Sequence, residues 1–115
     1  MKAGRTFFFD VSHHLPEYKG KCEQLHGHTY RLDVVVEGKV GKEGMVLDFN
    51  EIKKVVEIEV IERLDHMDLN KVIKNPTAEH VVEWIWTQLE GKLNLSSLKL
   101  YEGKGKWVEK TKNGS

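Results

Sequence analysis

Residues 28–37 read HTYRLDVVVE, and this stretch decides the fold because its apolar and polar side chains alternate. In a β-strand, side chains at every second position lie on the same face. One face therefore carries His28, Tyr30, Leu32, Val34 and Val36, and the other carries Arg31, Asp33 and Glu37. The pattern predicts a half-buried strand at about Thr29 to Glu37, with one face on a core.

A second strand is expected at about Thr6 to His13, where the sequence FFFDVSH begins at Phe7. By the same alternation, Phe7, Phe9, Val11 and His13 share a face. If the two strands pair antiparallel with their apolar faces aligned, His13 lies at the same end and on the same side as His26 and His28.

The histidines His26 and His28 are spaced to bind one metal ion. At positions i and i+2 of an extended segment both imidazoles project from one face, and Gly27 between them adds no obstructing side chain. Zinc suits neutral imidazole, and three protein nitrogens with an open position is a common catalytic arrangement. A surface or hydrogen-bonded histidine is the ordinary alternative. The aligned third histidine, His13, favours a Zn²⁺ site over that alternative.

The remaining pattern predicts two helices and then two more strands within one domain, residues 1–115. Asp48 resembles an N-cap, and apolar residues then recur at helical spacing from Phe49 to Leu64. A second helix is expected after Asn75, with Pro76 in its first turn. Alternation resumes from Leu98 to Glu102, and a last strand is expected from Lys106 to Glu109.

The predicted order β-β-α-α-β-β gives an α+β fold, a four-stranded antiparallel sheet with both helices on one face. Such a sheet has two open edges, and association through them is one way to cover them. The formal net charge is zero with 31% charged residues, which argues against nucleic-acid and membrane partners. Without a long apolar segment, the chain is expected to be soluble and cytoplasmic.

Cys22 is the single cysteine of the chain, so it cannot form an internal disulfide. A free cysteine is most often buried filler. Here the neighbouring residues are polar, and Lys21 together with a nearby zinc ion would favour the reactive thiolate.

Two further carboxylates suggest proton transfer or ligand binding. Asp65 directly precedes His66, and such a pair can orient an imidazole for proton transfer; the alternative is a histidine that interacts with the dipole at a helix C-terminus. Glu102 shares a strand face with Leu98 and Leu100. It either turns to solvent at the strand end or binds a ligand edge with two N–H donors, such as a pterin ring.

Together these residues resemble the 6-pyruvoyltetrahydropterin synthase and 6-carboxytetrahydropterin synthase family. The resemblance covers nearly the whole chain and is carried by Phe9–Pro16, Cys22–His28, Leu64–His66 with Leu69 and Asn70, Asn75–Glu79, and Glu102. It implies the tunnelling fold, in which subunits join sheet edges into a trimeric barrel and two trimers form a homohexamer.

The resemblance also implies roles for individual residues. Zinc would bind His13, His26 and His28; Cys22 would move protons on the substrate side chain; and Asp65 with His66 would relay them. Glu102 would anchor the pterin and assist the relay, with Thr77 as a weaker pocket residue. Gly103 departs from the threonine that members often carry there.

The implied reaction is zinc-dependent conversion of 7,8-dihydroneopterin triphosphate to 6-pyruvoyl- or 6-carboxy-tetrahydropterin with triphosphate elimination, the carboxy product leading toward queuosine. Zinc acts as a Lewis acid, and no redox cofactor is needed. Glu23 leaves another outcome open, because members that act in folate synthesis carry a glutamate three residues before His-Gly-His and cleave the side chain to 6-hydroxymethyldihydropterin. A non-catalytic pterin-binding zinc module is the third hypothesis.

Overall fold

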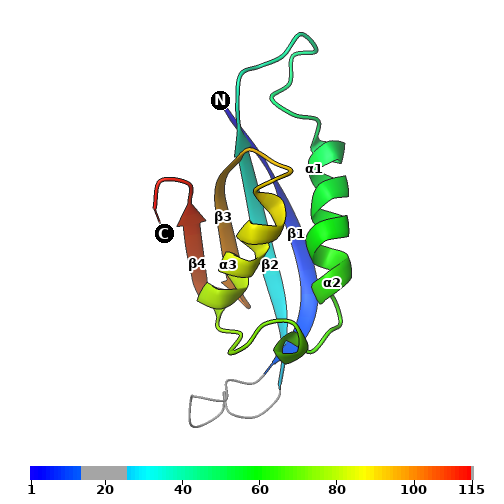
Figure 1. Ribbon diagram of the computed structural model, residues 1–115, viewed down its shortest axis with the longest axis vertical. Helices are drawn as coiled ribbons and strands as arrows, with labels where there is room; N and C mark the ends of the chain where they lie inside the picture. The colour runs from blue at the N-terminus through cyan, green and yellow to red at the C-terminus, as the bar shows by residue number, and fades with distance from the viewer. Residues whose placement is uncertain (14–25, 115) are drawn as a thin grey trace.

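The computed structural model describes residues 1–13 and 26–114, and for His26 and Gly27 it describes the backbone alone. One antiparallel sheet has the strand order β1-β2-β3-β4, with the strands Lys2–His13, His26–Glu37, Leu95–Glu102 and Trp107–Thr111. The helices lie between β2 and β3 in the sequence and cover one face of the sheet (Figure 1). The predicted α+β fold with the order β-β-α-α-β-β is confirmed.

The first helical segment contains a stretch of π-helix that the sequence pattern does not reveal. Helix α1 (Phe49–Val56) continues through the π-helical η2 (Glu57–Ile61) into α2 (Glu62–Leu64), so the predicted limits Phe49 and Leu64 are both correct. The buried residues Val56, Val60 and Leu64 recur every fourth position across this junction. The spacing of apolar residues therefore looks the same as in an uninterrupted α-helix.

The second main helix, α3 (Ala78–Leu89), begins two residues after Pro76, which was expected in its first turn. Thr77 is its N-cap, and its hydroxyl oxygen accepts a hydrogen bond of 3.2 Å from the His80 backbone N–H. Such a bond satisfies one of the backbone donors that a helix start leaves without a partner. Pro76 therefore precedes the helix, and a short 3-10 helix, η3 (Leu69–Lys71), lies between α2 and α3.

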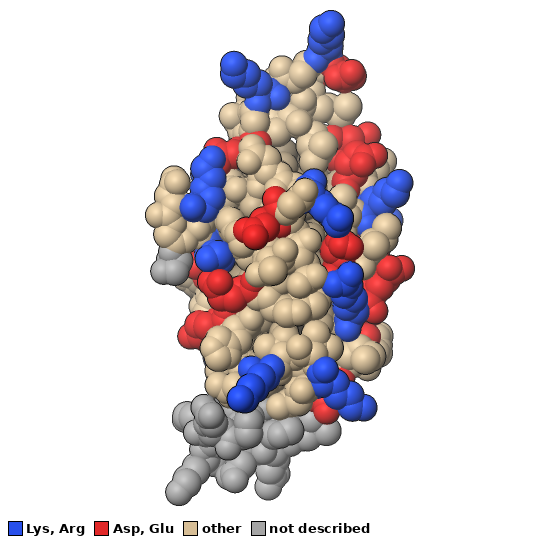
Figure 2. All heavy atoms as spheres, viewed as in Figure 1, with Lys and Arg blue, Asp and Glu red and all other residues tan. Residues whose placement is uncertain are grey.

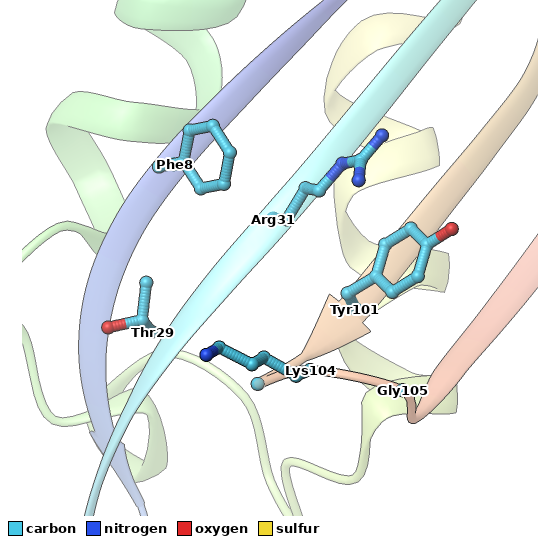
Figure 3. Close-up of a pocket in the computed structure, with 7 residues that line it drawn as sticks. Phe8, Thr29, Arg31, Tyr101, Lys104 and Gly105 are labelled. Carbon is cyan, nitrogen blue, oxygen red and sulfur yellow. The ribbon is translucent and has the colours of Figure 1, made fainter.

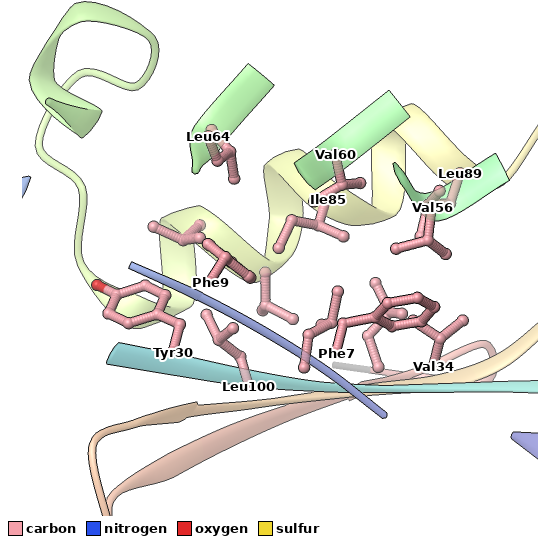
Figure 4. Close-up of a cluster of buried hydrophobic side chains, with 14 of the residues drawn as sticks. Phe7, Phe9, Tyr30, Val34, Val56, Val60, Leu64, Ile85, Leu89 and Leu100 are labelled. Atoms are coloured by element: carbon pink, nitrogen blue, oxygen red, sulfur yellow. The ribbon is translucent and has the colours of Figure 1, made fainter. Parts of the chain in front are cut away.

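The pairing of β1 with β2 follows the register that the two alternating patterns require. Phe9 lies opposite Tyr30, Val11 opposite His28, and His13 opposite His26. The inward side chains of the sheet pack against the helices to form the core (Figure 4). Its fully buried members include Tyr30, Leu32, Val34, Val36, Ile52, Val56, Val60, Leu64, Ile85, Leu89, Leu98 and Leu100.

Three strands begin earlier than the sequence predicts, including β2, which starts at His26 rather than Thr29. Strand β1 starts at Lys2, and a Cβ atom at Gly4 would lie 2.9 Å from the backbone oxygen of Val34, so only glycine permits this close approach. Strand β3 starts at Leu95, and the β2–β3 register shifts between Val35 and Val36. Leu95 and Ser96 are both buried at this irregularity, which breaks the alternation that would have identified the strand.

Charges of both signs are interspersed on the helix-covered side of the molecule (Figure 2). This distribution agrees with the formal net charge of zero. Among the described residues, no helix combines the length and apolar character needed to cross a membrane.

Leu98 offers a direct test of the core. It is fully buried on β3 opposite Val34, so Leu98→Ala should leave a cavity and lower the free energy of unfolding by about 2–5 kcal/mol. Urea denaturation followed by circular dichroism measures this loss. Val40→Ala, at a side chain that is 47% exposed, is the control and should change stability by less than about 0.5 kcal/mol. Equal losses for the two variants would contradict this packing.

Candidate functional site

Three side chains that can bind a metal meet at the end of the core. His13 projects from β1, His28 from β2 and Glu102 from the last position of β3, and their ligand atoms all lie within 4.8 Å of one another. The Nε2 atom of His28 is 3.3 Å from Oε1 of Glu102, and Nε2 of His13 is 4.0 Å from the same oxygen. This cluster can hold one metal ion.

The cluster is shielded from water to different degrees. The side chain of His13 is 1% exposed, whereas those of His28 and Glu102 are 18% and 19% exposed. The imidazole rings of the two histidines lie 4.7 Å apart between centroids. One side of the cluster is therefore fixed in the core while the other remains accessible, as binding of a small molecule at a metal would require.

Tyr30 supports the cluster from the core side. Its hydroxyl oxygen lies 3.1 Å from Nδ1 of His13, and its ring packs edge-to-face against Phe9 with centroids 5.6 Å apart. Burial, and secondarily the carboxylate of Glu102, raises the pKa of Tyr30 well above its ordinary value. The hydroxyl group therefore keeps its proton.

A second cluster, formed by Asp10, Asp65 and His66, lies at the outer edge of β1. Asp65 accepts a hydrogen bond of 3.0 Å from the Asp10 backbone N–H, and its other carboxylate oxygen is 3.1 Å from Nδ1 of His66. The His66 backbone N–H donates to the Asp10 carbonyl oxygen at 2.6 Å. Two backbone groups of the edge strand thus hold the Asp65–His66 pair in place.

The backbone of His66 has left-handed geometry, with φ at 62°, directly after the helix ends at Leu64. Histidine tolerates this region better than most residues. The side chain of His66 is 77% exposed, while that of Asp65 is 34% exposed. An exposed imidazole held by a carboxylate can exchange protons with a ligand that approaches this edge.

The structure brings together only part of the predicted site. His13, His28 and Glu102 meet, and the side chain of Glu102 turns toward the histidines. The Asp65–His66 pair forms a separate cluster, and the Thr77 hydroxyl caps α3. Cys22 and Glu23 lie outside the described residues. His26 lies opposite His13 in the strand register, but its side chain is not among those described.

The opposite face of the sheet carries a separate hollow of about 580 Å³ (Figure 3). Its lining consists of Phe8, Thr29, Arg31, Tyr101 and the turn of residues 103–105. Arg31 is paired with Asp33 at 3.0 Å, and its guanidinium group lies over the Tyr101 ring. No member of the His13–His28–Glu102 cluster lines this hollow.

Sequence reasoning missed three residues that support the two clusters. The alternation pattern identifies Tyr30 only as an apolar member of its strand face, although its position two residues after His28 places it beside the histidines. Asp10 lies opposite Thr29 in the register, and the Thr29 hydroxyl donates a hydrogen bond of 2.6 Å to its carboxylate. Such a cross-strand pair becomes recognisable only when the register is known.

A family model described as 6-pyruvoyl tetrahydropterin synthase matches residues 2–113 of this chain. The chain belongs to this family. A 6-carboxy-5,6,7,8-tetrahydropterin synthase from Haemophilus influenzae is 31% identical over 129 aligned positions, which cover 88% of this chain and 92% of that protein. A dihydroneopterin monophosphate aldolase from Pyrococcus furiosus is 47% identical over 91 aligned positions, which cover 76% of this chain and 78% of that protein.

Solved structures agree with this family assignment. The 6-pyruvoyl tetrahydropterin synthase from Caenorhabditis elegans superimposes with a TM-score of 0.88 at 25% identity, over all of this chain and 96% of that one. An uncharacterised Wolinella succinogenes protein shares the fold at 16% identity, with a TM-score of 0.76. The predicted family, the tunnelling fold and a lyase-type enzyme of pterin biosynthesis are therefore confirmed.

The Asp65–His66 pair can be tested through stability. Asp65→Ala removes the acceptor for the Asp10 N–H and the partner of the His66 imidazole, so we expect a loss of about 1 kcal/mol in the free energy of unfolding. Asp65→Asn keeps a side-chain oxygen as acceptor, so its free energy of unfolding should fall by less than that of Asp65→Ala. Chemical denaturation measures both, with Glu62→Ala on the neighbouring exposed helix surface as control. An Asp65→Ala variant as stable as Glu62→Ala would contradict the anchoring role.

Proposed function

We propose that this chain is a zinc-dependent carbon–oxygen lyase that converts 7,8-dihydroneopterin triphosphate to 6-pyruvoyl- or 6-carboxy-tetrahydropterin with elimination of triphosphate. The observation that carries the proposal is the meeting of His13, His28 and Glu102 at the end of the core, in a chain of this family. The carboxy product also requires loss of the other two side-chain carbons as acetaldehyde, and it would place the enzyme on the route to queuosine.

The donor set fits zinc. Two imidazoles on neighbouring strands, with a third nitrogen or a carboxylate, match the ligands of catalytic zinc sites. His26 is the proposed third ligand, because its backbone lies opposite His13. Glu102 is the competing third ligand, since its oxygen already lies near both histidines. When bound there, zinc would act as a Lewis acid on the substrate oxygens and acidify the adjacent C–H bonds.

The other residues have roles in binding and proton transfer. Cys22 as thiolate is the proposed base for the substrate side chain, and the Asp65–His66 pair is the proposed relay. Glu102 would accept hydrogen bonds from two N–H groups of the pterin ring. The involvement of the Thr77 hydroxyl in the helix cap supports a structural role more than contact with substrate.

The two clusters lie on different parts of one subunit, and His66 is largely exposed at an edge strand. We propose that sheet edges of neighbouring subunits pair to form the trimeric barrel, and that two barrels stack into a hexamer. The Asp65–His66 pair of one subunit could then serve the metal site of the next. Strands β1 and β4 form the two edges of the described sheet. The loop after α2 pairs with β1 at Asp10 and Ser12, so pairing between subunits would use the remainder of that edge.

A second candidate reaction is cleavage of the side chain to 6-hydroxymethyldihydropterin with Glu23 as the catalytic acid–base group. It is favoured by the relative from Pyrococcus furiosus, whose name describes an aldolase acting on dihydroneopterin monophosphate. This reaction breaks a carbon–carbon bond and releases no triphosphate. The two candidates therefore differ in both product and preferred substrate.

Metal content tests the proposed ligands. The purified chain should bind one Zn²⁺ per subunit. Loss of a group that only hydrogen-bonds a metal ligand typically lowers metal affinity by about 10–100-fold. His28→Ala removes a proposed ligand itself and should therefore lower zinc affinity by more than this. Competition with a chromogenic chelator measures the affinity. His80→Ala, at an exposed histidine on α3, is the matched control and should bind zinc normally.

The same assay identifies the third ligand. His26→Ala should lose zinc, whereas Glu102→Gln should keep zinc and lose substrate binding. The opposite result, in which only Glu102→Gln loses the metal, would assign the third position to Glu102 and contradict its role as the pterin anchor.

Product identification distinguishes the two reactions. With dihydroneopterin triphosphate, the wild-type chain should release triphosphate, and Cys22→Ala should lower that rate by about 10²–10⁴-fold, the usual contribution of a positioned base. Glu23→Ala should retain the activity. Mass spectrometry identifies the pterin product and detects acetaldehyde. Formation of the hydroxymethyl pterin from the triphosphate or the monophosphate, lost in Glu23→Ala, would replace the lyase proposal with the aldolase one.

A further inference from the structure

The hydroxyl group of Tyr30 is buried at the point where the apolar core meets the metal-binding cluster. Tyr30 is 0% exposed, and its hydroxyl points away from the packed apolar side chains (Figure 4). Contact with Phe9 holds the ring, and the 3.1 Å separation from Nδ1 of His13 places the hydroxyl within hydrogen-bond distance. A phenylalanine would fill the same space without introducing a buried polar group.

The two nitrogens of His13 face different partners. Nδ1 faces Tyr30, whereas Nε2 faces the cluster, 4.0 Å from the Glu102 carboxylate. A neutral imidazole carries one proton, and the nitrogen that binds a metal must present its lone pair. If Nε2 is the metal-binding atom, the proton must lie on Nδ1, and that N–H then donates to the Tyr30 oxygen.

We propose that Tyr30 is a positioning residue for the metal site: its hydroxyl oxygen accepts the hydrogen bond from Nδ1–H of His13 and thereby directs the Nε2 lone pair toward His28 and Glu102. The inference rests on the proposed metal site and adds a residue to it. Groups that hydrogen-bond the outer nitrogen of a metal-binding histidine fix its tautomer and ring orientation, and their loss usually lowers metal affinity.

Two features of Tyr30 suit this role. As a phenol, the Tyr30 hydroxyl is a neutral hydrogen-bond partner and adds no charge beside the metal. The central strand β2 carries both Tyr30 and His28, two residues apart on one face. The same backbone segment therefore sets the position of one metal ligand and of the group that orients the other.

Tyr30→Phe tests the inference through zinc affinity in the full chain. We expect the dissociation constant for Zn²⁺ to rise by about 10–100-fold, with an unchanged circular dichroism spectrum. Tyr101→Phe is the matched control, because it removes a tyrosine hydroxyl from the opposite face of the same sheet and should bind zinc like the wild type. Equal zinc affinity of wild type and a folded Tyr30→Phe variant would overturn the role of Tyr30 and leave the metal site intact.

The tautomer itself is measurable in the wild-type chain, which keeps the inference testable if Tyr30→Phe does not fold. In zinc-loaded protein labelled with ¹⁵N in its histidine rings, the nuclear magnetic resonance spectrum should show His13 protonated at Nδ1 and metal-bound at Nε2. Metal binding at Nδ1 would overturn the inference. A wild-type chain that binds no zinc would overturn the metal site and, with it, this role of Tyr30.

Discussion

The antiparallel register of β1 and β2 is the constraint on which both the core and the candidate site depend. Side chains alternate along a strand, so a slip of one residue would turn Phe7, Phe9 and Val11 from the core to the solvent. Burial of these side chains against the helices therefore fixes the register. The same register places His13 opposite His26 and brings the His13 and His28 rings to 4.7 Å. Packing of the apolar side chains therefore also brings the candidate metal ligands together.

Polar groups gather where the core reaches the end of the sheet. His13 and Tyr30 are almost completely buried, and Glu102 is one-fifth exposed beside them. Buried polar groups stabilise a fold less than apolar groups of the same shape, and they become costly when a partner is lost. A function for the cluster would explain why polar groups are buried here, and binding of a metal ion by these side chains is one such function.

The loop after α2 links the helical layer to the edge of the sheet. His66 and Met67 exchange backbone hydrogen bonds with Asp10 and Ser12 along β1, so the loop extends the sheet locally in a parallel direction. This pairing gives the Asp65–His66 dyad a fixed position despite the exposure of the His66 ring. The His66 ring is therefore accessible from solvent and still held in one place.

Most of the fold could be predicted from alternation and helix spacing, because each pattern reports which face of an element is buried. The predicted strand boundaries are wrong where contacts between strands override a local sequence rule. The β2–β3 irregularity hides the start of β3 at Leu95, and Gly4 lies within a strand although glycine usually weakens one. Thr77 serves as the N-cap of α3. Its hydroxyl is used by the backbone, and the residue type alone does not reveal this.

For the site, the sequence by itself determined the chemistry of the participants: histidines at alternate strand positions, an aspartate–histidine pair and a carboxylate at the end of an apolar strand face. Only the tertiary structure decided which of them meet. It brought Glu102 beside His28, separated the Asp65–His66 dyad into its own cluster, and placed the Tyr30 hydroxyl against His13. The physical reason is that residue type and spacing fix the face a side chain occupies, whereas distances between elements depend on register, and register is set by the packing of the whole sheet against its helices.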